Sequence, residues 1–363
     1  SLQSKTSTTE EALLLQAHHA RVSIRRGVDA TSRVTAIRGH SSFITGMVAV
    51  STGHLFTAST AGELRRWHLE TALRGNAPRQ CWNSRGTGNH TLFTADGQTL
   101  YASEDGVSIA VLDATTLVRR GLVSGVHRLI GRSHQSIWGV SADGLALVRW
   151  EHDRQEHTEE VARAATTITN GALAENGQRL CFTRASGELC TLELDGSGTI
   201  HTAAAKHEYL WSLTLDREAR RLWTVNNHRR VECRSIPDGT IIWSTPAPAV
   251  TTDLRSIPHS QTLAVALENG DIQIHDASTG ALLRAIPSGS SAIQSIVATS
   301  DGRRLVGGGI EGDLHVIDIE SGTYLASIAV GAVGPIHNVR IADTTGSIAV
   351  LGKSGLLRMV RTQ

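Results

Sequence analysis

A repeat of about 42 residues is the feature of this sequence that most constrains its fold. Residues 270–283 and residues 312–325 share one pattern, in which a Gly-Asp pair opens a run of alternating polar and apolar residues. Self-similarity at a fixed period of this size is typical of solenoids, propellers and other repeat arrays. The chain therefore predicts a repeat architecture rather than a set of unrelated domains.

A glycine turn ahead of an alternating strand marks the same place in successive repeats. One unit lacks the glycine, and Asn226-Asn227 takes its place, because asparagine is the next best residue for a turn that requires positive φ. Two further turn types, an Asx-Gly pair and a Thr-Gly or Ser-Gly pair, divide the units into short strands. The turn glycines are Gly62, Gly106, Gly144, Gly187, Gly270, Gly312 and Gly355.

Three turns per repeat divide it into four strands, which is the content of one propeller blade. The sequence therefore predicts an all-β propeller of four-stranded antiparallel blades. Eight units can be counted through their third strands, and seven blades plus an irregular region around residues 120–160 are the alternative. The third strands are expected to begin near Leu64, Ile109, Leu147, Leu189, Val231, Ile272, Leu314 and Leu356.

The two ends of the repeat region suggest how the ring closes. The last unit stops directly after its third strand, and an unassigned strand at residues 33–38 lies upstream of the first unit. We expect this strand to complete the last blade, because closure removes exposed sheet edges. The chain then divides into an N-terminal arm, residues 1–31, and a single propeller domain, residues 32–363. Within the arm, the spacing of Thr8 and Glu11 fits a capping box and favours a short helix over residues 9–18.

In the first unit, Gly39-His40 is followed by a strand–turn–strand over residues 55–68 that ends in Trp67-His68. This arrangement resembles WD40-repeat proteins, whose units contain a Gly-His pair and end in Trp-Asp. The pattern covers roughly residues 33–363, although no unit keeps Trp-Asp. The resemblance implies a structural network of hydrogen bonds within a blade. It assigns His40, Ser59 and Trp67 to this network in the first unit, with Ala61 in place of the expected Asp, and His127, Ser141, Asp143 and Trp150 in the third.

Composition and motifs narrow the functional classes. The 35 basic and 34 acidic residues nearly balance, which argues against a broad nucleic-acid surface. No apolar run approaches the roughly 18 residues that a membrane-spanning helix needs. The 17 histidines and four cysteines show no metal-ligand spacing, and neither a nucleophile elbow nor a phosphate loop occurs. We therefore expect no catalytic residue, no metal and no cofactor, in a protein of the cytoplasm or nucleus that does not insert into membranes.

The loops on one face of the propeller are the expected place for a protein or peptide partner. In WD40-like proteins the connection that leads into the inner strand of each blade lines this face, so the resemblance places docking there. Residues 206–211 stand out because Tyr and Trp are enriched in interface hot spots. The candidate partner-binding residues are Phe43, His90, Arg128, Tyr209, Trp211, Asp253 and Ile336.

These observations favour a non-enzymatic protein–protein interaction scaffold that is a subunit of an intracellular multiprotein complex. One alternative is an eight-bladed propeller enzyme or quinoprotein-like redox protein with a site in the axial channel. Residues 276–280 carry the Asp-x-x-Thr-Gly turn of such domains, and Trp243 stands where they have a tryptophan that docks between blades. The other alternative is an RNA-associated subunit that binds through the N-terminal arginines Arg21, Arg25, Arg26, Arg33 and Arg38.

Overall fold

A computed structural model of the chain describes most of the residues between Arg33 and Arg361. The N-terminal arm with its expected helix, and the predicted positions Phe43, His90 and Gly355, lie outside the described residues. The described residues are 33–38, 40, 42, 44–50, 53–68, 71, 80–83, 92–94, 97–133, 136–151, 158–174, 176–195, 197–203, 209–287, 292–329, 336–341, 347–352 and 356–361.

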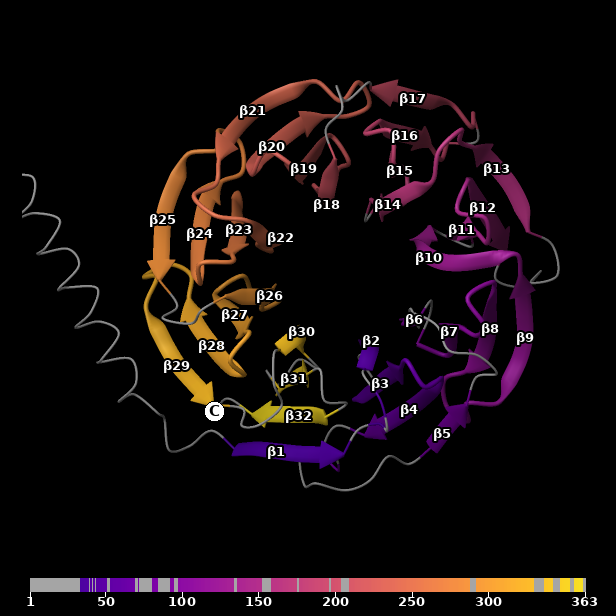
Figure 1. Cartoon of the computed structure of the whole chain (residues 1–363), viewed down its shortest axis with the longest axis horizontal. Helices are drawn as coiled ribbons and strands as arrows, with labels where there is room; N and C mark the ends of the chain where they lie inside the picture. The colour runs from indigo at the N-terminus through magenta and orange to yellow at the C-terminus, as the bar shows by residue number, and fades with distance from the viewer. Residues whose placement is uncertain are drawn as a thin grey trace, which may run out of the picture.

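The fold is an all-β propeller, in which four-stranded antiparallel sheets form blades around a central opening (Figure 1). The described strands make up eight such sheets. In seven of them four consecutive strands follow one another from the opening to the perimeter. We call the strand nearest the opening the inner strand of its blade.

The first four sheets follow the chain in order. The first contains β2 (Ile44–Val50), β3 (His54–Ser59), β4 (Glu63–His68) and β5 (Gln80–Asn83). The second contains β6 (Leu92–Thr94), β7 (Thr99–Ser103), β8 (Ser108–Asp113) and β9 (Arg119–Ser124). The third contains β10 (Val126–Ser133), β11 (Ser136–Ser141), β12 (Ala146–Glu151) and β13 (Glu159–Arg163). The fourth contains β14 (Ile168–Leu173), β15 (Arg179–Arg184), β16 (Leu189–Glu193) and β17 (Ile200–Ala203).

The remaining four sheets complete the set. The fifth contains β18 (Leu210–Leu215), β19 (Arg221–Asn226), β20 (Arg230–Ser235) and β21 (Ile241–Pro246). The sixth contains β22 (Thr251–Ser256), β23 (Thr262–Leu267), β24 (Asp271–Asp276) and β25 (Leu282–Pro287). The seventh contains β26 (Ile293–Ala298), β27 (Arg304–Gly309), β28 (Asp313–Asp318) and β29 (Tyr324–Ala329). The eighth combines β30 (Ile336–Ile341), β31 (Ser347–Gly352) and β32 (Leu356–Arg361) with β1 (Arg33–Arg38).

The eighth sheet joins the two ends of the described chain. β1 pairs antiparallel with β32, and the register runs from Arg33 opposite Arg361 to Arg38 opposite Leu356. The strand at residues 33–38 thus has the partner that the sequence predicts. The third strand of every sheet, from β4 to β32, also begins within one residue of its predicted position.

The turns confirm most of the glycine pattern and correct one part of it. The six described turn glycines have φ between 76° and 89°, a region that favours glycine. In the β19–β20 turn of the fifth sheet, however, the residue with positive φ is Arg229, at 56°, and not Asn226 or Asn227. The side-chain oxygen of Asn226 instead accepts backbone N–H bonds from His228 and Arg230, so this asparagine stabilises the turn as a side-chain acceptor.

Apolar side chains of neighbouring blades pack against one another. Phe56 and Leu64 of the first blade share a buried cluster with Leu100 and Leu112 of the second. Close to the opening, β27 and β30 approach so tightly that a Cβ on Gly308 would lie 2.5 Å from Ile336 Cγ2. Gly308 therefore lies at a crowded point of β27, where a larger residue would collide with the next blade.

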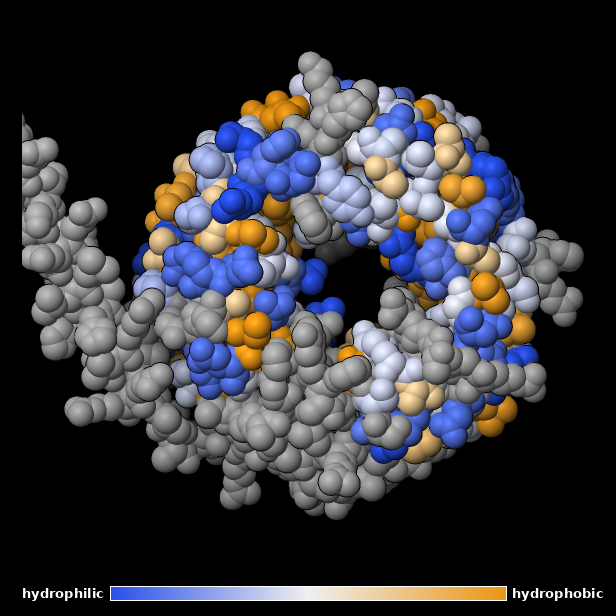
Figure 2. All heavy atoms as spheres, in the orientation of Figure 1, coloured by the Kyte–Doolittle hydropathy of each residue, from blue (hydrophilic) through white to orange (hydrophobic). Residues whose placement is uncertain are grey.

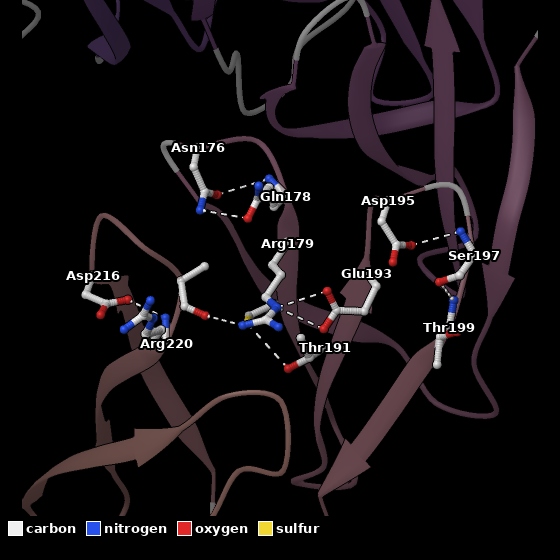
Figure 3. Close-up of polar contacts among 12 residues, drawn as sticks. Asn176, Gln178, Arg179, Thr191, Glu193, Asp195, Ser197, Thr199, Asp216 and Arg220 are labelled. Carbon is white, nitrogen blue, oxygen red and sulfur yellow. Dashed lines mark hydrogen bonds and ion pairs between the residues drawn. The ribbon is translucent and has the colours of Figure 1, made fainter.

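Polar groups also tie blades together, as the boundary between the fourth and fifth sheets illustrates (Figure 3). Arg179 on β15 donates from Nε to both carboxylate oxygens of Glu193 on β16, at 2.8 and 2.9 Å. Its Nη1 donates at 2.8 Å to the backbone oxygen of Ala219, in the β18–β19 turn. One guanidinium therefore links two strands of its own blade to the next blade.

A second inter-blade contact places a side chain of one outer strand on the glycine turn of the next blade. Trp243 on β21 packs against Gly280, and its Nε1 donates at 3.2 Å to the backbone oxygen of Ala277. One blade further on, Arg284 on β25 takes the corresponding place and donates to the backbone oxygens of Glu320 and Ser321. Tryptophan and arginine thus perform the same docking role in adjacent blades.

We expect Gly280→Ala to lower the free energy of unfolding by about 2–4 kcal/mol. Gly280 has φ of 74°, and an added Cβ would lie 2.5 Å from the Trp243 ring. Gly106→Ala is the matched control, because Gly106 has φ of 80° but nothing within 4 Å of its Cβ position. It should cost only the backbone component, about 1–2 kcal/mol. Equal losses for the two variants, measured by urea denaturation, would show that the Trp243 contact is not tight.

Candidate partner-binding site around the central opening

The inner strands surround an opening through the centre of the disk (Figure 1), and Figure 2 shows hydrophilic residues around part of its rim. Each inner strand of the first seven sheets is the first strand of its sheet, so these strands all enter the blades from the same face. The residues just before and early in each inner strand therefore gather around one end of the opening.

Three of the predicted partner-binding residues occupy these places. Arg128 lies early in β10, Tyr209 directly precedes β18, and Asp253 lies in β22. The backbone of Trp211 belongs to β18, while its side chain lies outside the described part. Ile336, the first residue of β30, is completely buried, so it belongs to the inter-blade core and not to an exposed surface.

Arg128 bridges from its own blade to the next one. Its two terminal nitrogens donate to the backbone oxygens of Ile168, at 3.0 Å, and Thr169, at 2.6 Å, both on β14. Burial lowers the pKa of the Arg128 guanidinium, and the phenol group of Tyr209 partly offsets this effect. The third and fifth blades therefore bring Arg128 and Tyr209 near each other, and the Tyr209 side chain remains exposed.

Asp253 links the sixth blade to the seventh. Its Oδ1 accepts the backbone N–H of Leu254 at 2.9 Å, and its Oδ2 accepts that of Ile296 on β26 at 3.0 Å. Arg255, two residues along β22, approaches Oδ1 with Nε at 3.3 Å. The carboxylate is thus bound on several sides by groups of the protein itself.

Two arginines at the opening were not anticipated from the sequence. Arg255 is the fifth residue of β22 and Arg340 is the fifth residue of β30, whereas β26 between them has Val297 at that place. Burial lowers the pKa of Arg340, Arg255 lowers it further, and Asp253 partly opposes both effects. The sequence signal for these two residues is an arginine at the same position of two inner strands. This signal is visible only once the repeats are aligned position by position.

The predicted blade network of the first unit exists with a different central residue. His40 Nε2 lies 2.7 Å from Thr57 Oγ1, and Trp67 Nε1 donates to that same oxygen at 2.8 Å. Ser59 is buried, but its hydroxyl has no hydrogen-bond partner within the described part of the chain. Because Trp67 pairs with Leu55, its diagonal neighbour on the same face is Thr57 and not Ser59.

In the third unit, three of the four predicted network residues are connected. His127 Nδ1 donates at 2.7 Å to the backbone oxygen of Ser141, whose hydroxyl donates to Asp143. The bond from Ser141, assisted by Arg163, holds the pKa of Asp143 well below its usual range. The prediction for Trp150 was wrong, because its indole N–H has no partner among the described residues and its ring lies edge-on to Tyr101.

Two buried cysteines, Cys181 and Cys190, lack the features of a nucleophile. Cys181 pairs with Thr191 and Cys190 with Phe182, so the two thiols do not face each other across β15 and β16. Burial raises the pKa of Cys181 to about 11 and also raises that of Cys190, which keeps both as thiols near neutral pH. Over the described ranges, no three His, Cys, Asp or Glu side chains gather in a way that could hold a metal ion. No helix among those residues is long and apolar enough to cross a bilayer.

A hollow of about 530 Å³ lies between the sixth and seventh blades, at the opposite face from the loops that lead into the inner strands. It is lined by turn residues such as Ser260, Gly302 and Arg303 and by Leu283 and Arg284 of β25. The Arg284 guanidinium is held there by the backbone oxygens of the next blade. This hollow is therefore separate from the site around the opening.

Comparison with known proteins establishes the fold alone. No protein-family model matches the chain, and neither does any curated protein. The computationally designed Ika8 protein is similar, with a TM-score of 0.75 and 15% identity over 90% of this chain and 99% of that one. Sqt1 of Chaetomium thermophilum, bound to the N-terminus of the ribosomal protein L10, is similar with a TM-score of 0.75 and 14% identity, over 91% of this chain and 99% of that one. Sqt1 of Saccharomyces cerevisiae is similar with a TM-score of 0.75 and 11% identity, over 90% of this chain and 97% of that one.

Proposed function

We propose that this chain is a non-enzymatic protein–protein interaction scaffold, a WD40-like propeller of eight blades closed through β1. The pairing of β1 with β32 supports closure, as do the contacts of β30 with both β26 and β2. A rigid disk of this kind presents loops on a fixed frame, which suits recognition better than chemistry that needs moving parts. On this proposal the chain is a subunit of a complex in the cytoplasm or nucleus and is not inserted into membranes.

One observation carries this proposal: three blades bring Arg128, Tyr209 and Asp253 to the same end of the opening. Tyrosine and arginine are over-represented among residues that dominate binding energy. The comparison with a Chaetomium thermophilum Sqt1 bound to the N-terminus of a ribosomal protein supports a peptide as the kind of partner that this architecture holds. A protein or peptide docking on this face is therefore the proposed partner.

Tyr209→Ala should weaken capture of the native partner by about thirtyfold, the effect of a loss of roughly 2 kcal/mol at a hot spot. The partner is first recovered by mild affinity purification of the tagged chain from its native cell and identified by mass spectrometry. Its affinity for the wild type and for Tyr209→Ala is then measured by titration calorimetry. Val118→Ala is the matched control, because Val118 is also an exposed side chain but leads into the outer strand β9.

The outcome separates this proposal from the two alternatives. If Tyr209→Ala and Val118→Ala bind equally, the site is not where we place it. An eluate without stoichiometric protein but with a chromophore or metal would instead support the redox alternative, which the docking of Trp243 between blades favours. Co-purifying RNA that is released by salt would support the nucleic-acid alternative.

A further inference from the structure

The charges at the opening are not balanced between the sixth and eighth blades. Arg255 and Arg340 come from β22 and β30, the two inner strands that contact β26 from either side. Arg255 on β22 lowers the pKa of Arg340 on β30. Two guanidinium groups are therefore held within electrostatic range of each other, and Asp253 is the carboxylate that acts on both.

Asp253 cannot neutralise both arginines. Its two oxygens already accept backbone N–H bonds from Leu254 and Ile296, and its closest guanidinium contact is with Arg255. Arg340 makes no ion pair with a carboxylate among the described residues. The three side chains together carry one excess positive charge in a partly desolvated place, where Coulomb interactions are stronger than in water.

The donors of Arg340 are also largely unused. Its Nη1 donates at 3.0 Å to the backbone oxygen of Val339, directly beside it in the chain. Its Nε and Nη2 have no acceptor among the described residues, although an arginine has five N–H donors. Arg128, which lies nearer the start of its inner strand in the third blade, shows the contrast, because both of its terminal nitrogens donate to carbonyls of the next blade.

We propose that Arg255 and Arg340 form an anion-binding site at the central opening that receives a carboxylate side chain of an acidic peptide segment. The proposal rests on the proposed function, because it names the kind of partner which that site takes. A carboxylate accepts two parallel bonds from one guanidinium fork and relieves the repulsion between the two arginines. The site thus accounts for a half-buried arginine, Arg340, that forms no ion pair with a carboxylate of the described residues.

A peptide fits this site better than a nucleic acid does. Nucleic-acid binding requires several phosphate contacts and is accompanied by a basic domain, whereas this chain has a formal net charge of only +1. The single excess positive charge here is local, shared by two guanidinium groups and one carboxylate. A single carboxylate, or an Asp or Glu pair in an extended segment, satisfies it.

The test uses a fluorescein-labelled hexaglutamate peptide and the full chain, with binding followed by fluorescence anisotropy at low salt. Hexaglutamine and hexalysine peptides serve as ligand controls. Arg340→Gln and Arg255→Gln should each weaken hexaglutamate binding about tenfold or more, because each removes charge-assisted hydrogen bonds. Arg303→Gln is the matched control, since it removes one positive charge from the opposite face, and it should change binding less than twofold.

A stability measurement distinguishes a binding role from a structural one. If Arg340 serves binding, Arg340→Gln leaves the urea midpoint unchanged or raises it, because a repulsion disappears. A lowered midpoint together with unchanged hexaglutamate binding overturns the proposal, and so does equal binding by all three variants. Tighter binding of an oligouridine than of hexaglutamate, with the same dependence on Arg340, also overturns it in favour of RNA. Capture of the native partner through Tyr209 is measured separately, so it stands or falls independently.

Discussion

Glu232→Ala lowers the free energy of unfolding by about 3–5 kcal/mol, because it removes the carboxylate that pairs with the buried guanidinium of Arg234. Glu232 and Arg234 lie two residues apart on β20, with side chains 2% and 6% exposed. Arg234 donates to Glu232 Oε2 from Nε at 3.0 Å and from Nη2 at 2.6 Å. The other carboxylate oxygen accepts from Asn226 and Ser244, so all four groups form one buried network in the fifth blade.

The measurement is equilibrium unfolding in urea, followed by tryptophan fluorescence, with two further variants for comparison. Glu160→Ala removes an ion pair whose partner Arg163 is 48% exposed, so it should cost less than about 1 kcal/mol. The double variant Glu232→Leu with Arg234→Met removes both charges at similar volume and should recover about 2 kcal/mol of the loss. If Glu232→Ala costs no more than Glu160→Ala, water reaches the pair and the buried network is not the source of stability.

The sequence predicts the strand positions well because glycine turns and alternation repeat with the blade. Chain connectivity and the 42-residue period determine where the third strand of each unit begins, and the missing fourth strand points to residues 33–38. These features depend on local backbone conformation and on the need to cover sheet edges. Both are properties of single residues and their spacing, so one sequence suffices to find them.

The partners of individual polar side chains could not be predicted in the same way. Whether Trp67 bonds to Thr57 or to Ser59 depends on the register between β3 and β4. In the observed register Thr57 lies diagonally opposite Trp67, and Ser59 lies two residues further along β3. Glu232 and Arg234 look like the solvent-facing residues of an alternating strand, yet both are buried. The hydrogen-bond partner in the first case and the burial in the second depend on how strands and blades pack against each face of the sheet. The periodicity of one strand does not contain this information.

At the candidate site, too, the positions of the residues could be predicted, whereas their burial and partners could not. The topology places Arg128, Tyr209 and Asp253 around the opening as expected, but Ile336 at the equivalent place is core, because β27 with its glycines packs directly on it. Arg255 and Arg340 were missed because arginine in a strand normally marks a solvated face. Their significance comes from the convergence of the sixth and eighth sheets, which are not adjacent, on the central opening, and this arrangement is visible only in the folded chain.

His315 should make the propeller less stable as pH falls from about 6.5 to 4. The side chain is 2% exposed on β28, its ring lies edge-on to Tyr324, and its Nε2 has no hydrogen-bond partner among the described residues. Burial lowers the pKa of His315 from 6.5 to about 4. Below pH 6.5 the unfolded chain therefore binds a proton that the folded chain does not, which favours unfolding, whereas above pH 6.5 the two states bind equally. At pH 4.5 this residue alone should reduce the free energy of unfolding by about 2.5 kcal/mol.

The experiment compares the wild type with His315→Gln by urea denaturation between pH 7.5 and pH 4.5. Other titrating groups, including His275, whose pKa burial also lowers, are common to both proteins and cancel in the difference. His315→Gln loses packing against Tyr324 and is expected to be the less stable protein at pH 7.5. The gap should then close or reverse by about 2.5 kcal/mol towards pH 4.5. His228→Gln, which changes an exposed turn residue, should keep a constant difference from the wild type. A pH-independent gap for His315→Gln would mean that the imidazole is protonated in the folded blade and has a partner that compensates for its burial.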